Sequence, residues 1–189
     1  MHICCAPDAT VGIERLKRFG ELLGWFYNPN IEPIYEYRIR ETEVRRLTTL
    51  EEIEYTEEPP DRIGWKLAVA GFEAEPERGE RCRRCISFNL EQAAKRAVDL
   101  GIRAFATTLT ASPHKDVPTI HRLGAEIAGR YRIGYIAETL RRDGGLARRR
   151  ELTDRWGIYR QKYCGCRWSL ADYYRRQGIA PEESEPWVE

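Results

Sequence analysis

Short apolar runs alternate along this chain with longer segments in which apolar residues recur every three or four positions. The short runs, typical of buried strands, are residues 2–5, 22–27, 102–109 and 133–137. The periodic segments predict helices at 9–20, 34–50, 82–100 and 117–130, and a last helix from Cys166 or Trp168 to Gln177. Residues 64–71 fit a strand or a helix equally well. Strands alternating with helices predict an α/β protein, a three-layer parallel sheet flanked by helices.

This topology predicts where a functional crevice lies. Ligands of parallel sheets bind beyond the carboxyl ends of the strands. Residues 4–5, the loop 110–115 and the Arg- and Gly-rich connection 141–150 are expected to converge there. We expect residues 1–189 to form a single α/β domain, with residues 176–189 as a mobile tail.

Composition narrows the class of protein. Hydrophobic residues make up 42% of the chain and charged residues 32%, which is typical of a globular domain and excludes a disordered chain. No apolar stretch is long enough for a transmembrane helix, and the start of the chain lacks the pattern of a signal peptide. We therefore expect a cytoplasmic protein that does not act at a membrane.

The charges are segregated, although the net charge is only +1. Residues 51–61, expected to be a connection, carry six acids and no base. Residues 141–167 carry nine bases against three acids. A uniformly basic coat for nucleic acid is excluded, but the second region can attract a polyanion.

All six cysteines lie in closely spaced pairs: Cys4 and Cys5, Cys82 and Cys85, and Cys164 and Cys166. Disulfides do not persist in the cytoplasm, so this arrangement predicts thiolates gathered around metal. The first two cysteines can share a centre only if their strand ends there, which Pro7 favours. An iron–sulfur cluster takes up to four thiolates and leaves two for a second metal or a redox dithiol. A zinc site with two inert buried cysteines is the structural alternative.

Nucleotide-binding motifs are missing from the sequence. It has no SGGxDS-type pyrophosphate loop after the first strand, no GxxxxGK[ST], and no GxGxxG after a strand. ATP, GTP and nicotinamide cofactors therefore have no recognisable binding motif here.

Six segments in chain order resemble the QueH family, the cobalamin-independent epoxyqueuosine reductases of tRNA modification. They are HICCAP at 2–7, NPNIEP at 28–33, EYRIR at 36–40, RCRRC at 81–85, TTLTASPHKD at 107–116 and YRQKYCGC at 159–166. The resemblance implies reduction of epoxyqueuosine to queuosine at the wobble position of the tRNA anticodon stem-loop, with electrons from an external donor. It also implies a [4Fe-4S] cluster, a second metal ion, iron, and a fold related to the pyrophosphate-loop ATPases (HUP-like) without their ATP loop.

Within this resemblance we assign the cluster to Cys4, Cys5, Cys82 and Cys85. Cys164 and Cys166 then form the catalytic second centre, as metal ligands or as a redox dithiol, with Asp8 as a third ligand. The expectation that all six thiols lie in one site does not depend on which thiols hold which metal. Removing an epoxide oxygen as water takes two electrons and two protons, and a metal ion with an open position polarises the C–O bond.

An anticodon loop is expected to contact cations, which meet its phosphates, and flat side chains, which stack on its bases. The candidates are Lys115, Arg148, Arg149, Arg160, Tyr163 and Trp168. The alternative is that the aromatic residues belong to the core and the arginines to a solvated face. His2 is either a proton donor or a buried strand residue, and Asp116 is expected to cap the helix that follows it.

Two other functions share parts of this pattern. A cluster-dependent tRNA sulfurtransferase would share the fold and the three cysteine pairs, but it activates its base with ATP, for which this sequence has no loop. A non-enzymatic zinc module that binds RNA would be colourless, whereas a protein with an iron–sulfur cluster is brown.

Overall fold

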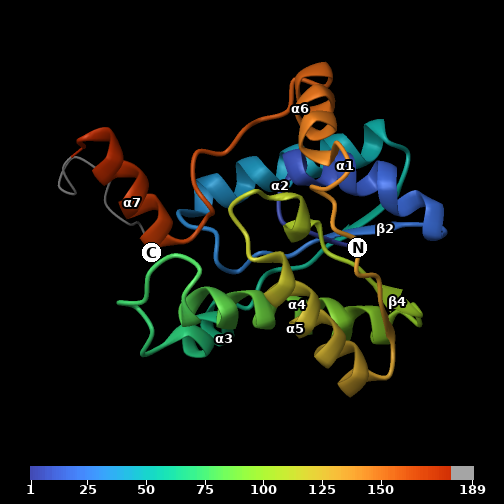
Figure 1. The fold of residues 1–189 in the computed structure, drawn as a ribbon, viewed down its shortest axis with the longest axis horizontal. Coiled ribbons are helices and arrows are strands. Elements are labelled where there is room, and N and C mark those ends of the chain that lie inside the picture. The colour runs from blue at the N-terminus through green and yellow to red at the C-terminus, as the bar shows by residue number, and fades with distance from the viewer. Residues whose placement is uncertain (180–189) are drawn as a thin grey trace.

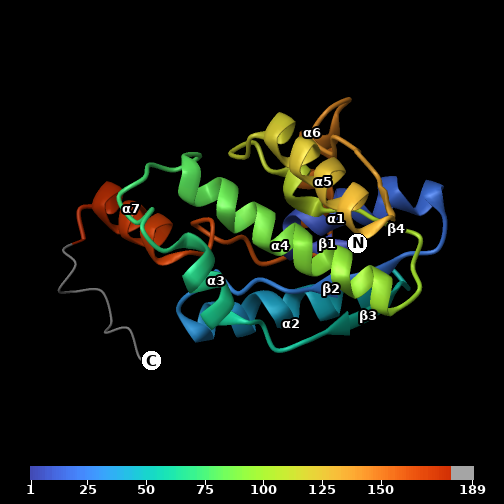
Figure 2. The same cartoon turned by 90° about the horizontal axis from the view of Figure 1, so that it is seen from below.

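The computed structural model describes residues 1–179, and it shows helices packed on both faces of parallel strands (Figures 1 and 2). The strands are β1 (His2–Ile3), β2 (Leu23–Phe26), β3 (Glu54–Glu57), β4 (Ala104–Phe105) and β5 (Gly134–Tyr135). The helices are α1 (Ala6–Leu16), α2 (Ile34–Leu50), α3 (Arg62–Val69), α4 (Glu80–Asp99), α5 (Val117–Tyr131), α6 (Gly145–Arg155) and α7 (Arg167–Gln177). Two short 3₁₀ helices complete the fold, η1 (Lys17–Phe19) and η2 (Thr108–Ala111).

One backbone contact joins the two parts of the sheet. β1, β2 and β3 pair in parallel in that order, and β4 pairs in parallel with β5. The His2 N–H donates to the Ala106 carbonyl at 2.8 Å, beside a parallel bridge between His2 and Thr107. The described strands therefore follow the order β3-β2-β1-β4-β5. Helices α1 and α2 cover one face and α4 and α5 the other, which confirms the predicted parallel α/β arrangement.

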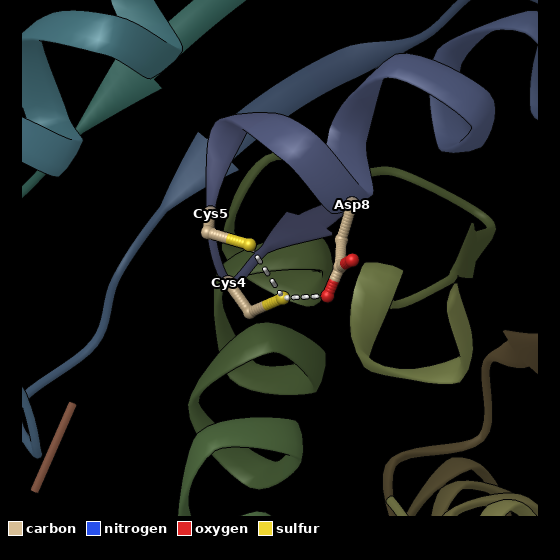
Figure 3. Close-up of side chains that lie close together, drawn as sticks. All are labelled: Cys4, Cys5 and Asp8. Carbon is tan, nitrogen blue, oxygen red and sulfur yellow. Dashed lines mark hydrogen bonds between the residues drawn. The ribbon is translucent and has the colours of Figure 1, made fainter. Parts of the chain in front are cut away.

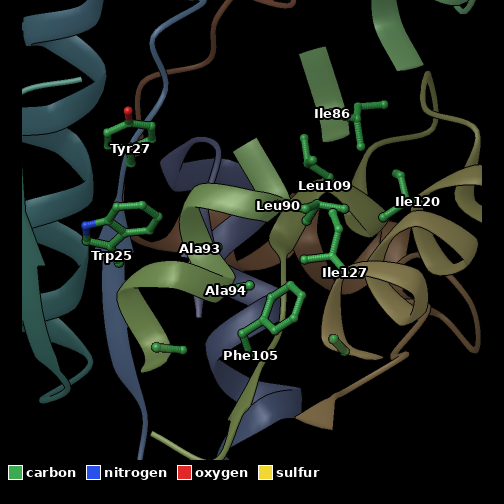
Figure 4. Close-up of a cluster of buried hydrophobic side chains, with 12 residues drawn as sticks. Trp25, Tyr27, Ile86, Leu90, Ala93, Ala94, Phe105, Leu109, Ile120 and Ile127 are labelled. Carbon is green, nitrogen blue, oxygen red and sulfur yellow. The ribbon is translucent and has the colours of Figure 1, made fainter. Parts of the chain in front are cut away.

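The side chains of β2 alternate between two hydrophobic clusters, one on each face of the sheet. Trp25 and Tyr27 face the cluster beneath α4 and α5 (Figure 4). Phe26, between them, faces the cluster beneath α1 and α2. A period of two with both faces apolar is what a central parallel strand requires, because helices cover it on both sides.

Three segments differ from the sequence-based expectation. Residues 51–61 contain β3, an edge strand whose two end residues are exposed, so its sequence EYTE has no apolar run. Residues 141–150 contain the start of α6, which buries few side chains and therefore shows no apolar stripe. The strand expected at 102–109 is limited to β4, because the chain turns into η2 directly afterwards.

The other helices agree better with the prediction, since α2, α4, α5 and α7 begin and end within two residues of it. The ambiguous segment 64–71 forms most of α3. Arg176 and Gln177, expected to open a mobile tail, belong to the last turn of α7, and the rest of that expectation concerns mainly residues 180–189, outside the described residues. Within residues 1–179, no helix is both long and apolar enough to cross a bilayer.

His2 is a buried strand residue at the junction of the two sheet parts. Its Nδ1 lies 2.9 Å from the Thr107 hydroxyl and its Nε2 lies 3.1 Å from the Tyr27 carbonyl. Its ring packs edge-on against Trp25. Burial lowers the pKa of His2 to about 4. The imidazole is therefore neutral at pH 7 and fixed by structural contacts, which is the structural interpretation of this residue.

This burial predicts a pH-dependent stability. A histidine that titrates near 6.5 when unfolded and near 4 when folded contributes its full stabilisation above pH 6.5 and loses it as the pH falls towards 4. We expect about 3 kcal/mol of acid destabilisation from His2, absent in His2→Asn. Urea unfolding at pH 7 and pH 4.5 measures it. His114→Gln, at an exposed histidine, serves as the control and should behave as wild type. Equal acid sensitivity in His2→Asn and wild type would contradict the assignment.

Candidate metal centre

Three helix N-termini place the cysteines at the carboxyl edge of the sheet. The six residues are Cys4 and Cys5 before α1, Cys82 and Cys85 in the first turns of α4, and Cys164 and Cys166 before α7. Cys5 is the N-cap residue of α1 and Cys166 that of α7. A helix N-terminus carries partial positive charge and favours a thiolate over a thiol. A helix N-terminus therefore lies at each of the three pairs.

The first group consists of Cys4, Cys5 and Asp8 (Figure 3). Because β1 ends at Ile3, the chain turns into α1 and brings adjacent side chains together, as the sequence required for a shared centre. The two sulfurs are 3.8 Å apart, and Cys4 Sγ is 3.5 Å from Asp8 Oδ2. Two sulfurs bound at 2.3 Å to one tetrahedral ion are also about 3.8 Å apart. This group has the spacing of a site for a single metal ion.

Neighbouring side chains orient the first group. The Thr108 hydroxyl accepts from the Cys4 N–H at 3.0 Å and donates to Cys4 Sγ at 3.2 Å. Arg149 Nη1 donates to Asp8 Oδ1 at 2.5 Å, which leaves Oδ2 turned towards Cys4. The hydrogen bond with Cys5, burial, and the charges of Cys5 and Asp8 raise the pKa of Cys4. A metal ion would therefore displace a proton from Cys4 on binding.

The second group consists of the four remaining cysteines, gathered around Lys115. The Lys115 ammonium donates to Cys164 Sγ at 2.9 Å. Burial opposes its charge, but Cys164, with smaller contributions from Cys82 and Cys85, raises the pKa of Lys115. Burial, followed by the charge of Cys164, raises the pKa of both Cys85 and Cys166. The four sulfurs and the ammonium therefore share one electrostatic environment.

The sulfurs of the second group are more widely spaced than those of the first. Across the described residues, only the group of Cys4, Cys5 and Asp8 brings three ligand atoms within 4.8 Å of one another. A single ion needs such closeness, whereas a [4Fe-4S] cluster binds each thiolate at a separate iron corner. The four thiols of the second group fit a polynuclear cluster in donor type and number. The sequence-based assignment, with the cluster on Cys4, Cys5, Cys82 and Cys85, combines one pair from each of these groups.

The segment 28–33 contacts all three cysteine-bearing segments. Asn28 Nδ2 donates to the carbonyl of Ile3, just before Cys4, at 2.8 Å. Asn30 Oδ1 accepts from Asn89, a buried residue of α4 whose Nδ2 also lies 3.9 Å from Cys85 Sγ. The Glu32 N–H donates to the Gly165 carbonyl at 2.8 Å, between the last two cysteines. The motif NPNIEP thus connects the three cysteine-bearing segments through hydrogen bonds.

Gly165 needs to be glycine for two reasons. Its φ of +136° lies in the region that residues with a Cβ avoid. A Cβ here would also lie 2.9 Å from Ile31 and 3.2 Å from the Arg40 guanidinium. A glycine between Cys164 and Cys166 therefore allows this segment to pack closely against α2 and the segment 28–33.

Comparisons with known proteins show the family of this chain. The model of the epoxyqueuosine reductase QueH family matches residues 1–172. The chain belongs to the QueH family. Curated QueH relatives include that of Streptococcus pyogenes serotype M1, 36% identical over 88% of this chain and 68% of the relative. That of Thermotoga maritima is 37% identical over 91% of this chain and 90% of the relative, and that of Acinetobacter baylyi 36% identical over 93% and 81%.

The other residues expected to act in this QueH protein lie in varied environments. Lys115 is at the second group, and Arg149 is engaged by Asp8 of the first. Arg148 pairs with Glu14 at 2.6 Å and Arg160 with Asp154 at 2.6 Å, both on the surface. Asp116 caps α5 through Thr119, which confirms the capping role.

The two aromatic candidates make internal contacts. The Tyr163 hydroxyl donates to the Glu32 carbonyl, and its ring lies 5.2 Å from the Arg40 guanidinium carbon. Trp168 packs against Trp65 and under the guanidinium of Arg81. Both side chains are half-buried. Their described contacts therefore agree with the alternative that these aromatic residues belong to the core.

Sequence reasoning missed the polar residues that hold the centre together: Asn30, Glu36, Arg40, Asn89 and Thr108. Four of them lie in the motifs that carry the family resemblance, and Asn89 lies near the cysteines in α4, yet no role follows from the residue types alone. One pattern was available, because Glu36 and Arg40 are four apart on a predicted helix and can pair.

Proposed function

We propose that this chain reduces epoxyqueuosine to queuosine at the wobble position of tRNA. The reaction breaks the two C–O bonds of the epoxide, forms a carbon–carbon double bond and releases the oxygen as water. Two protons and two electrons balance it, and the electrons come from an external donor. The observation that carries the proposal is the presence of two groups of cysteines: one is spaced for a single ion, and the other has four thiols that suit a cluster in donor type and number. The names of the QueH relatives support the substrate.

The metals divide between the groups in a way that differs from the sequence-based assignment. We assign a [4Fe-4S] cluster to the group of four, Cys82, Cys85, Cys164 and Cys166. We assign the second ion, iron, to Cys4, Cys5 and Asp8. Their two sulfurs and one oxygen would leave a coordination position of the ion open. When bound, the cluster supplies single electrons and the ion polarises a C–O bond. Cys164 and Cys166 then act as cluster ligands, and Asp8 stays at the reacting centre.

The chain's own residues prepare the substrate side of this centre. A surface hollow opens onto Cys82 and Lys115, and its wall includes Arg78 and Arg83. Arg78 and Arg83 can bind a segment of nucleic acid backbone beside Glu77 and Asp116 of the same wall. Lys115, which also lines the hollow, donates to Cys164 Sγ. Lys115 therefore remains a substrate-binding candidate.

The tRNA is proposed to bind along α6 and the segment that follows it. Arg148 and Arg160 form exposed ion pairs there, which are weak in water and can be exchanged for phosphates. Arg150 is also exposed. The strand order β3-β2-β1-β4-β5 supports the proposed relationship to HUP-like folds. We also propose a cytoplasmic reaction, because the substrate is a tRNA.

The division of metals predicts different results for two cysteine variants. Cys85→Ser should remove the absorbance near 400 nm, because the cluster loses a ligand. Cys4→Ser should retain this band and lose about one iron per chain. Both should lower epoxyqueuosine turnover at least a hundredfold. Anaerobic iron and sulfide assays with turnover measure this, with Ser87→Ala of α4 as control. Loss of the cluster in both Cys4→Ser and Cys85→Ser would favour the sequence-based assignment instead.

The proposed RNA surface predicts a change in salt dependence. Arg148→Ala with Arg150→Ala should weaken tRNA binding and flatten the slope of log Kd against log salt by about 0.7 for each lost phosphate contact. Fluorescence anisotropy at several salt concentrations measures the slope. Arg149 is left intact because it holds Asp8. Arg122→Ala, at an exposed, ion-paired arginine on α5, is the control. An unchanged slope in the double variant would place the RNA elsewhere.

A further inference from the structure

Glu36 and Arg40 of α2 form a buried ion pair for which the proposed reaction has so far given no role. The exposed fractions of their side chains are 5% and 2%. Arg40 Nε donates to Glu36 Oε1 at 2.8 Å. Burying two charges is costly unless their remaining hydrogen-bonding groups also find partners. The partners therefore show what the pair holds.

Those partners all belong to the segment that carries the last two cysteines. Arg40 Nη1 donates to the Cys164 carbonyl at 2.9 Å, and Nη2 donates to the Tyr163 carbonyl at 3.1 Å. The Tyr159 hydroxyl donates to the other oxygen of Glu36 at 2.9 Å. The planar fork of an arginine fits two adjacent carbonyls in a way that a lysine cannot reproduce. The motif EYRIR thus binds the motif YRQKYCGC.

The guanidinium also interacts electrostatically with a cysteine of each group. Burial would lower the pKa of Arg40, but Glu36, then Cys5 and, more weakly, Cys164 raise it above its usual value. Cys5 belongs to the first group and Cys164 to the second. A buried charge is poorly screened by salt, so it acts on both centres.

We propose that Arg40 is a positioning residue of the reductase: it fixes the Tyr163–Cys164 backbone against α2 and holds one buried positive charge beside the cysteines. Glu36 partly neutralises that charge and orients the guanidinium. This inference rests on the proposed cluster at Cys82, Cys85, Cys164 and Cys166. Its consequence is electrostatic, because the charge favours the reduced, more negative state of the cluster.

Charge changes at Glu36 and Arg40 should shift the reduction potential of the cluster in opposite directions. Arg40→Gln should lower the equilibrium constant for cluster reduction about tenfold, which is 59 mV for one electron. Glu36→Gln should raise it several-fold, because Arg40 is no longer neutralised. Redox titration of the reconstituted protein, followed by electron paramagnetic resonance, measures both. Arg38→Gln, an exposed arginine two residues away on α2, should leave the potential unchanged.

If the ion pair had a purely structural role, the two variants would not shift the reduction potential of the cluster in opposite directions. Shifts in the same direction, or an Arg40→Gln shift no larger than that of Arg38→Gln, would overturn the proposal. If Arg40→Gln fails to fold by circular dichroism, Glu36→Gln decides: a raised potential supports the proposal and an unchanged one refutes it. Absence of a cluster from the wild-type protein would instead refute the proposed function on which the inference rests.

Discussion

The hydrogen bond from the His2 N–H to the Ala106 carbonyl determines where both thiol groups lie. It joins β1 to the end of β4, so the carboxyl ends of these strands are neighbours. Cys4 then emerges beside Thr108, which binds both its amide and its sulfur. The loop beyond η2 returns along the same edge and carries Lys115 to Cys164. Without this contact the three-stranded and two-stranded parts of the sheet would not share an edge.

The centre is assembled by polar contacts as well as by the sheet. The asparagines of the segment 28–33 and the Glu36–Arg40 pair hold backbone carbonyls and amides next to the cysteines, and they do so while buried. Buried polar groups of this kind specify one arrangement because each unsatisfied partner is costly. Burial raises the pKa of Cys85 and Cys166, and the hydrogen bond with Cys5 together with burial raises that of Cys4. Metal binding is thus coupled to proton release at a site already shaped by the fold.

Local pattern was enough to predict the layers, most helices and the gathering of the cysteines at one edge. It failed where burial is partial, as in the edge strand β3 and the Arg-rich helix α6, because such elements carry little apolar periodicity. The grouping of the cysteines could not be predicted either. Sequence spacing treats the three pairs alike, whereas the turn at Cys5 and the approach of α7 to α4 decide which sulfurs meet. Arg40 escaped notice because its partners are backbone atoms more than 120 positions away.

The metal content of protein purified without oxygen tests the central claim most directly. Absorbance with iron, sulfide and zinc assays on one sample gives the number and kind of metals per chain. Two thiol groups with the spacings described here predict a brown protein with a band near 400 nm, about five irons and about four sulfides. A colourless protein with one zinc ion and no sulfide would contradict the cluster and remove the basis for the redox chemistry.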